Sequence, residues 1–172
     1  MIDDPVTTTD ELIPSGETSS LRSNPLKLAE FTLQRKDPNY VPAAKRAKAL
    51  EEARAAAVKN GGEMPAELKK LLDLAGIEAE RVGLGSLVCA VKPGDGSARE
   101  QAASSQKMLG GQANVAREYA TKRYRSNLVN WGMAPWIVGD ADRAKFKTGA
   151  WLFIPGVRAF ASGDNTEIEA EL

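Results

Sequence analysis

The spacing of apolar residues predicts helices in the first half of the chain. Residues 1–24 are rich in Thr, Ser, Pro and Gly and show little periodicity, so we expect an extended N-terminal segment with turns. Pro25 suits the first position of a short helix. Farther along, apolar residues recur at helical spacing and glycine follows each stretch, which predicts a helical pair at 43–75. We interpret this pair as structural cover rather than as a partner-binding face.

From residue 84 onward, short apolar segments alternate with helical ones. Short apolar runs that are partly β-branched are typical of buried strands, and glycines after helical stretches mark helix ends. This order predicts parallel strands joined by right-handed crossovers. The expected fold class is therefore α/β, with a mostly parallel central sheet flanked by helices. The predicted strands are 84–91, 113–119, 134–138 and 150–154, and the predicted helices are 98–109 and 122–131.

The last residues of the sequence alternate between two kinds of side chain. Glutamate occupies every second position from 167 to 171, and less polar residues lie between, which predicts a half-buried strand. Because the alternation runs to Leu172 with no closing element, we expect the chain to be a piece of a longer protein. The alternative is a natural end on an edge strand, where glutamates would guard against aggregation.

Composition narrows the function classes. The 172 residues fit one domain, and 23 Lys plus Arg balance 23 Asp plus Glu, so nucleic acid and acidic membranes are not expected partners. No apolar run approaches the roughly 20 residues of a membrane span. Cys89 is the only cysteine and is expected in the core, which excludes disulfides and favours a reducing, cytoplasmic compartment. Histidine is absent and there is one cysteine, so Cys/His zinc sites and three-cysteine cluster sites are impossible within this chain.

The main candidate for chemistry is the segment 94–100, Gly-Asp-Gly-Ser-Ala-Arg-Glu, between a predicted strand and a predicted helix. Glycines permit a sharp turn, and the helix start offers free N–H groups and a positive dipole end to an anion. Arg99 in the first helical turn is easier to understand if an anion binds nearby. However, Ser97 and Glu100 also fit a capping box, which needs no function. The glycine spacing matches neither the phosphate loop nor the dinucleotide fingerprint.

Two further segments give this turn a context. Residues 8–16, Thr-Thr-Asp-Glu-Leu-Ile-Pro-Ser-Gly, precede Arg22, which follows Asp10 by twelve positions. Residues 125–135 read Arg-Ser-Asn-Leu-Val-Asn-Trp-Gly-Met-Ala-Pro. With the turn at 94–100, these segments resemble, in order, three motifs of the C-terminal swivel domain of the aconitase superfamily, which includes aconitate hydratases and isopropylmalate dehydratase small subunits. The resemblance implies a swivelling β/β/α domain over the whole range 1–172.

The resemblance also implies roles for individual residues. Ser97 matches the catalytic base that removes a proton from the substrate carbon, and Arg22 and Arg99 match arginines that bind substrate carboxylates. Ala98 stands where the family has a second substrate-contacting serine, so only its backbone N–H can serve. These roles are physically reasonable, because a helix N-terminus and guanidinium groups stabilise an alkoxide, and arginine binds carboxylates through two parallel hydrogen bonds. The chain departs from the family pattern at Glu11 and Gln101, where the family has histidines.

Family hydro-lyases also need a [4Fe–4S] cluster held by three cysteines. The resemblance therefore implies that the cluster lies on other domains, either of the same polypeptide or of a separate large subunit, and that this chain alone is inactive. The expected reaction isomerises or hydrates a di- or tricarboxylate by dehydration and rehydration. Arg22 favours the aconitase type over the isopropylmalate type. Two alternatives stay open: a homologous hydratase of unknown substrate, given Ala98 and the helical pair, and a cluster-free regulatory or RNA-binding relative, which the balanced charge disfavours.

Overall fold

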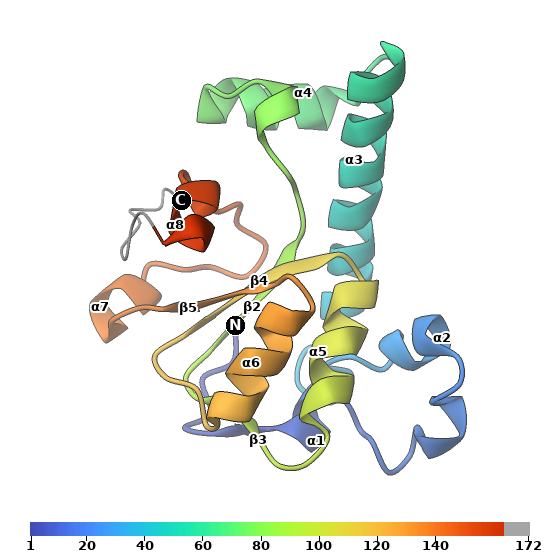
Figure 1. The fold of residues 1–172 in the computed structure, drawn as a ribbon, viewed down its shortest axis with the longest axis vertical. Coiled ribbons are helices and arrows are strands. Elements are labelled where there is room, and N and C mark those ends of the chain that lie inside the picture. The colour runs from blue at the N-terminus through green and yellow to red at the C-terminus, as the bar shows by residue number, and fades with distance from the viewer. Residues whose placement is uncertain (164–172) are drawn as a thin grey trace.

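Short parallel strands form two small sheets in this protein. The structure, a computed structural model, describes residues 1–163 (Figure 1). In chain order the elements are β1 (Thr7–Thr8), α1 (Thr9–Leu12), the 3-10 helix η1 (Ser19–Leu21), α2 (Pro25–Ala29), α3 (Tyr40–Asn60), α4 (Ala66–Ala75), the 3-10 helix η2 (Ala79–Arg81), β2 (Ser86–Ala90), β3 (Pro93–Asp95), α5 (Arg99–Met108), β4 (Gly111–Ala116), α6 (Lys122–Asn130), β5 (Ala134–Ile137), α7 (Asp140–Arg143) and α8 (Val157–Ser162).

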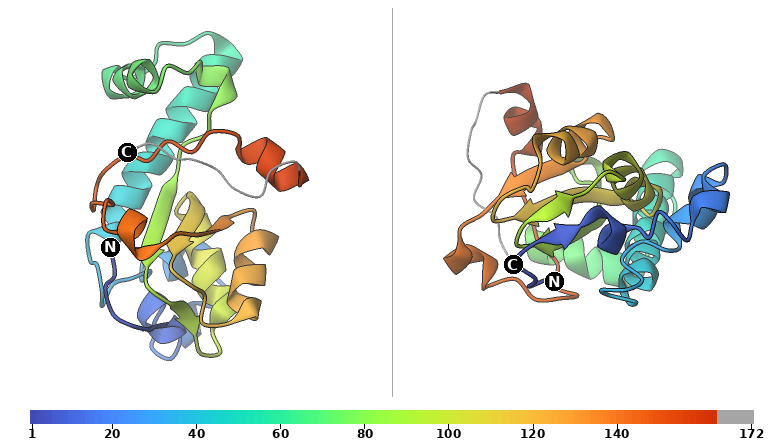
Figure 2. Two further views of the ribbon diagram at one scale, coloured as in Figure 1. Left: turned by 90° about the vertical axis from the view of Figure 1, so that its left-hand side faces the viewer. Right: turned by 90° about the horizontal axis from the view of Figure 1, so that it is seen from below.

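The larger sheet has the order β2-β4-β5, and the smaller one pairs β1 with β3. All of these pairs are parallel, with Val88 opposite Asn114 and Asn114 opposite Pro135 in the larger sheet. Helix α5 connects β3 to β4 and α6 connects β4 to β5, and the two helices lie side by side against the strands (Figures 1 and 2). The predicted α/β class, with parallel strands flanked by helices, is therefore confirmed.

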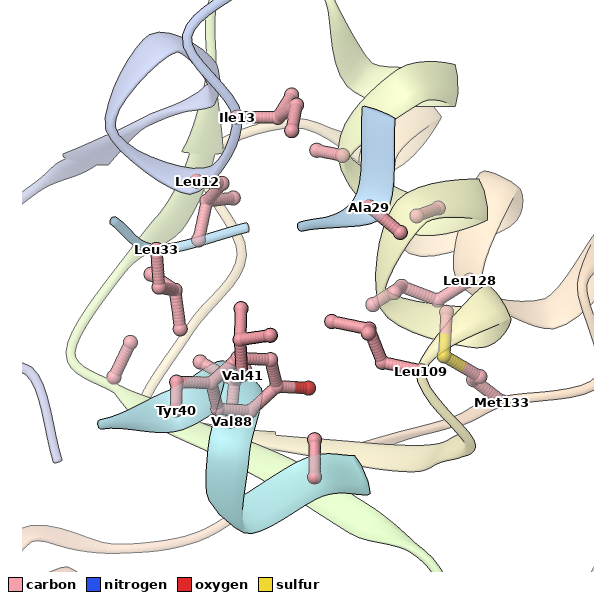
Figure 3. Close-up of a cluster of buried hydrophobic side chains, with 14 of the residues drawn as sticks. Leu12, Ile13, Ala29, Leu33, Tyr40, Val41, Val88, Leu109, Leu128 and Met133 are labelled. Carbon is pink, nitrogen blue, oxygen red and sulfur yellow. The ribbon is translucent and has the colours of Figure 1, made fainter. Parts of the chain in front are cut away.

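The main core lies where α5 and α6 meet the N-terminal segments. Buried side chains from the first 44 residues pack against Val88, Leu109, Leu128 and Met133. Figure 3 shows how the labelled side chains of Leu12, Leu33, Tyr40 and Val41 converge on this cluster. Burying a side chain of this size contributes roughly 1.5–3 kcal/mol, so the N-terminal segments are firmly attached to the sheet domain.

The predicted helical pair corresponds to α3 and α4, which extend from the β2 edge of the sheet (Figure 1). Both helices end at glycine in the left-handed conformation, Gly61 at φ 71° and Gly76 at φ 61°. Such residues are the usual helix stops because they carry no Cβ. A second cluster holds the pair together and consists of Leu50, Leu68, Leu72, Ala79 and Leu84.

Two expectations about secondary structure require correction. The segment 1–24, expected to be extended, contains β1, α1 and η1. The strand predicted at 150–154 is wrong, because within residues 1–163 this stretch belongs to no named strand. Its apolar residues instead line a cleft of about 850 Å³ together with Leu72 and Ile77. The strand predicted near the C-terminus, at 166–172, lies outside the described residues.

Candidate functional site

The first two segments that carry the family resemblance and the start of α6, the helix that holds most of the third, meet at the carboxyl ends of the parallel strands. Thr8 of β1 pairs with Asp95 of β3, and helices α1, α5 and α6 begin at this edge (Figure 1). Their N-caps are Thr8, Ala98 and Thr121. Ligands of open α/β sheets bind outside the carboxyl ends of the strands, so this edge is the natural place for a site.

Two glycines allow the turn after β3 to pack closely against α1 and α6. Gly94 and Gly96 have φ values of 96° and 123°, which side chains with a Cβ rarely adopt. A Cβ on Gly94 would overlap the ring of Tyr124 on α6, and one on Gly96 would overlap the side chain of Thr9 on α1. The glycines of the turn therefore serve packing: they let β3 and its turn pack against the helices of the other two segments.

Hydrogen bonds fix α6 to the same turn. The Thr121 hydroxyl donates to the Gly94 carbonyl at 3.3 Å and accepts from the Tyr124 amide at 3.2 Å. Farther inside, the Tyr124 hydroxyl accepts a bond of 3.0 Å from the Asn114 side chain. Tyr124 is completely buried, and burial raises the pKa of its phenol, so this hydroxyl stays neutral and acts as a structural group.

The structure brings three of the four predicted site residues together in one turn. Ser97 is exposed between β3 and α5, and its hydroxyl makes no hydrogen bond within residues 1–163. Ala98 is the N-cap of α5, and Arg99 is the first residue of the helix. The Arg99 side chain is half-buried and donates from Nη1 to the Gly96 carbonyl, so it folds back over the turn.

Arg22, the fourth predicted site residue, lies apart from this group. It is exposed at the end of η1, and among the described residues its guanidinium has no hydrogen-bond or ion-pair partner. Helix α2 begins three residues later and packs against α5, so the main chain near Arg22 belongs to the same side of the domain. No polar contact within residues 1–163 joins Arg22 to the Ser97 turn.

The expected capping box at Ser97 and Glu100 is wrong. Helix α5 begins one residue later than the box requires, so Ala98 is the N-cap and no side chain within residues 1–163 caps the helix. The first N–H groups of a helix have no acceptor within the helix, and here no side-chain cap satisfies them. The start of α5 is therefore open to an anion.

A capping box occurs instead at the start of α1. The Glu11 amide donates to the Thr8 hydroxyl at 3.3 Å, and the Thr8 amide donates to the Glu11 carboxylate at 2.7 Å. Burial opposes ionisation of Glu11, but hydrogen bonds from Lys36 and Thr8 outweigh it and lower the pKa of this carboxyl. Where the family pattern has histidine, Glu11 thus stabilises the local helix start. The neighbouring Asp10 pairs with Arg35 at 2.9 Å.

Glu100, Asn127 and Trp131 connect the second motif to the third. Trp131 Nε1 donates to Glu100 Oε1 at 2.6 Å, and Asn127 Nδ2 donates to Glu100 Oε2. From the sequence, Glu100 is assigned only to a capping box, and Asn127 and Trp131 have no individual role. The available signal was the spacing of Asn127 and Trp131, which places both on one face of α6.

The side chains of this chain do not fit an iron–sulfur cluster. Such a cluster needs several thiolates, and Cys89 is the only cysteine. Cys89 is buried in β2, and burial raises the pKa of its thiol. Within residues 1–163, no group of three or more His, Cys, Asp and Glu side chains is placed to hold a metal ion.

The predicted site lies on open surface. The cleft of about 850 Å³ lies at the opposite, amino ends of the strands, near Ser86, Gln112 and Ala134. A second hollow lies between α3 and α4, and neither includes residues 94–100. No helix among the described residues has the length and apolar character needed to cross a membrane.

Comparison with known proteins agrees with this arrangement. Residues 80–138 match the family model for the aconitase C-terminal domain. The fold is similar to the crystal structure of a 3-isopropylmalate dehydratase (leuD) from Methanocaldococcus jannaschii, with a TM-score of 0.55 and 22% identity over 99% of this chain and 77% of that one. A search of curated proteins gave no match. The matched range 80–138 contains the Ser97 turn and the whole 125–135 motif, whereas the segment 8–22 lies outside it.

Proposed function

From the match to the family model for the aconitase C-terminal domain, we propose that this chain is the substrate-closing domain of an aconitase-like hydro-lyase that acts on a di- or tricarboxylate. The observation that carries the proposal is the uncapped start of α5. Ser97, the Ala98 amide and Arg99 share one exposed turn there, and the other two motifs pack around it. These are the groups that dehydration of a hydroxy acid requires: a base and donors for a carboxylate.

Ser97 is the proposed base. It takes a proton from the substrate carbon as the neighbouring carbon loses hydroxide, which leaves an alkene, and the reverse addition of water gives the hydrated product. A serine can do this only if its alkoxide is stabilised, and we assign that role to the first N–H groups of α5, which no side chain within residues 1–163 caps, and to the Arg99 charge. Departure of the hydroxide is assigned to groups outside this chain.

Arg99 and Arg22 are the proposed carboxylate ligands. Arg99 donates one N–H to the Gly96 carbonyl. Because a guanidinium group has five N–H donors, the remaining donors of Arg99 can bind a carboxylate. Arg22 keeps the twelve-residue spacing from Asp10 and is exposed. The Ala98 amide replaces the contact that a second serine would make.

The proposed partner is a cluster-bearing domain, either in the same polypeptide or in a separate large subunit. A [4Fe–4S] cluster, whose thiolate ligands this chain cannot supply, would reside there. The exposure of the Ser97 turn supports this, because charged groups interact more strongly in a site closed off from bulk solvent and the second domain would close over the turn. A cytoplasmic location stays an expectation from the single cysteine.

The test is to co-produce the chain with its cluster-bearing partner under anaerobic conditions and to assay citrate, isocitrate and 3-isopropylmalate by the absorbance of the alkene product. We expect turnover of one of these acids by the complex and none by either component alone. Absence of turnover by a complex with an intact cluster would reject the hydro-lyase proposal. Retention of RNA on a filter by the chain alone would support the regulatory alternative.

A further inference from the structure

We propose that Glu100 is a positioning residue, which Asn127 of α6 and Trp131 at the C-cap of that helix hold so that the first turn of α5 presents Ser97 and Arg99 in one fixed orientation. This inference rests on the proposed function, because the turn that it fixes is the proposed catalytic turn. Glu100, Asn127 and Trp131 would then influence the proposed base and the proposed carboxylate ligand only through the backbone of the turn.

The geometry holds the carboxylate at both oxygens. Oε1 accepts from the indole of Trp131 at 2.6 Å, and Oε2 accepts from the amide of Asn127. The two donors lie four positions apart, in α6 and at its C-cap, so together they fix both the position and the rotation of the carboxylate. Glu100 is the second residue of α5 and directly follows Arg99. Any displacement of its backbone therefore moves the catalytic turn.

The arrangement adds little to the attachment of the two helices, which have other contacts. Ala102 and Ala103 of α5 and Leu128 of α6 are buried in the main core. Glu100 is exposed, and ion-dipole contacts at such positions contribute little to stability. What these contacts do restrain is the uncapped turn, whose other side-chain hydrogen bonds within residues 1–163 are those from Arg99 to the Gly96 carbonyl and from Thr121 to the Gly94 carbonyl.

The direction of the Glu100 side chain also matters for the anion. A glutamate in a capping box turns back to the N-terminus of its own helix, as Glu11 does on α1. Glu100 instead points to α6, which leaves the first N–H groups of α5 unobstructed and keeps a negative charge away from a substrate carboxylate. This choice is consistent with a helix start kept free for a ligand.

The test reverses the polarity of one contact in the complete enzyme. Asn127→Asp replaces the donor by a second carboxylate that faces Glu100 and repels it. In the double variant Glu100→Gln with Asn127→Asp, the introduced amide donates to the introduced carboxylate, and its oxygen still accepts from Trp131. Ser126→Asp is the matched control, because it adds the same charge at the next position of α6, where the hydroxyl bonds only the Lys122 carbonyl.

We expect kcat of Asn127→Asp to fall about 10- to 100-fold, with a smaller change in KM, because small displacements of catalytic groups have effects of this size. The double variant should recover to within about threefold of the parent, Ser126→Asp should keep the parent kcat, and all melting temperatures should stay close to that of the parent. Equal losses in Asn127→Asp and Ser126→Asp would overturn the proposal, since charge alone would then explain the effect. So would a loss that the double variant does not restore.

Hydrogen exchange separates this inference from the proposed function. In the complex, the amides of residues 98–101 should exchange faster in Asn127→Asp and return to parent rates in the double variant. Unchanged exchange overturns the positioning role whether or not the complex is active. If the parent complex turns over none of the three acids while exchange behaves as expected, the proposed function fails and the restraint itself stands.

Discussion

Gly94 gives the sharpest test of how the motifs are packed together. Gly94→Ala introduces a Cβ at φ 96°, where it would overlap the buried Tyr124 ring. The backbone conformation alone should cost about 1–2 kcal/mol. Overpacking against a closed core should add about 1–3 kcal/mol. The free energy of unfolding should therefore fall by about 2–5 kcal/mol.

Gly61→Ala is the matched control. Gly61 also has a positive φ, 71°, but a Cβ there meets no heavy atom within 4 Å. It should therefore show only the backbone cost of about 1–2 kcal/mol. Urea unfolding of the full chain, followed by far-UV circular dichroism, measures both values. Equal losses in the two variants would mean that β3 and α6 do not meet as described.

Two further predictions concern the ligand site and the N-terminal motif. In the complete enzyme, Arg22→Lys should raise KM about tenfold with little change in kcat, because the lysine point charge cannot make the two parallel hydrogen bonds to a carboxylate. Arg46→Lys, at another exposed arginine, is the control. If KM of Arg22→Lys is unchanged and equals that of the control, Arg22 does not belong to the site. Glu11→Gln should lower the free energy of unfolding at pH 7 by about 1 kcal/mol, the usual cost of a lost cap. The folded pKa of Glu11 is lowered, so its contribution is present above the ordinary pKa of 4.5 and is lost as the pH falls through the folded pKa. The difference between parent and variant should therefore shrink in acid, and a difference that is constant with pH would contradict the role of the ionised carboxylate.

The sequence predicted those parts of the fold that local patterns encode. The ends of α3 and α4 follow from Gly61 and Gly76, and the parallel order of β2, β4 and β5 follows from the alternation of strand and helix. The strand expected at 150–154 failed because an apolar run also suits the wall of a cleft, and periodicity cannot separate the two. Strand β1 has only two residues, and its pairing with β3 depends on long-range packing that no local pattern records.

At the candidate site, the sequence identified the turn but not how its side chains are used. Ser97 and Glu100 have the spacing of a capping box, yet the helix begins at Arg99 and leaves that box unformed. Where an exposed glutamate points depends on donors in another helix, here Asn127 and Trp131, and a single sequence does not show that they face it. The glycines were expected to permit a sharp turn, and the structure shows in addition that Cβ atoms on Gly94 and Gly96 would overlap side chains of neighbouring helices.

The central claim is that Ser97 is the base of a hydro-lyase, and kcat of Ser97→Ala in the complete enzyme tests it most directly. Loss of a general base should lower kcat by roughly 10²–10⁴. Ser97 is exposed, is not the N-cap and makes no hydrogen bond within residues 1–163, so the substitution should change stability by less than about 0.5 kcal/mol. A large loss of kcat at an unchanged melting temperature is the result we predict. A Ser97→Ala enzyme with parental kcat would contradict the account.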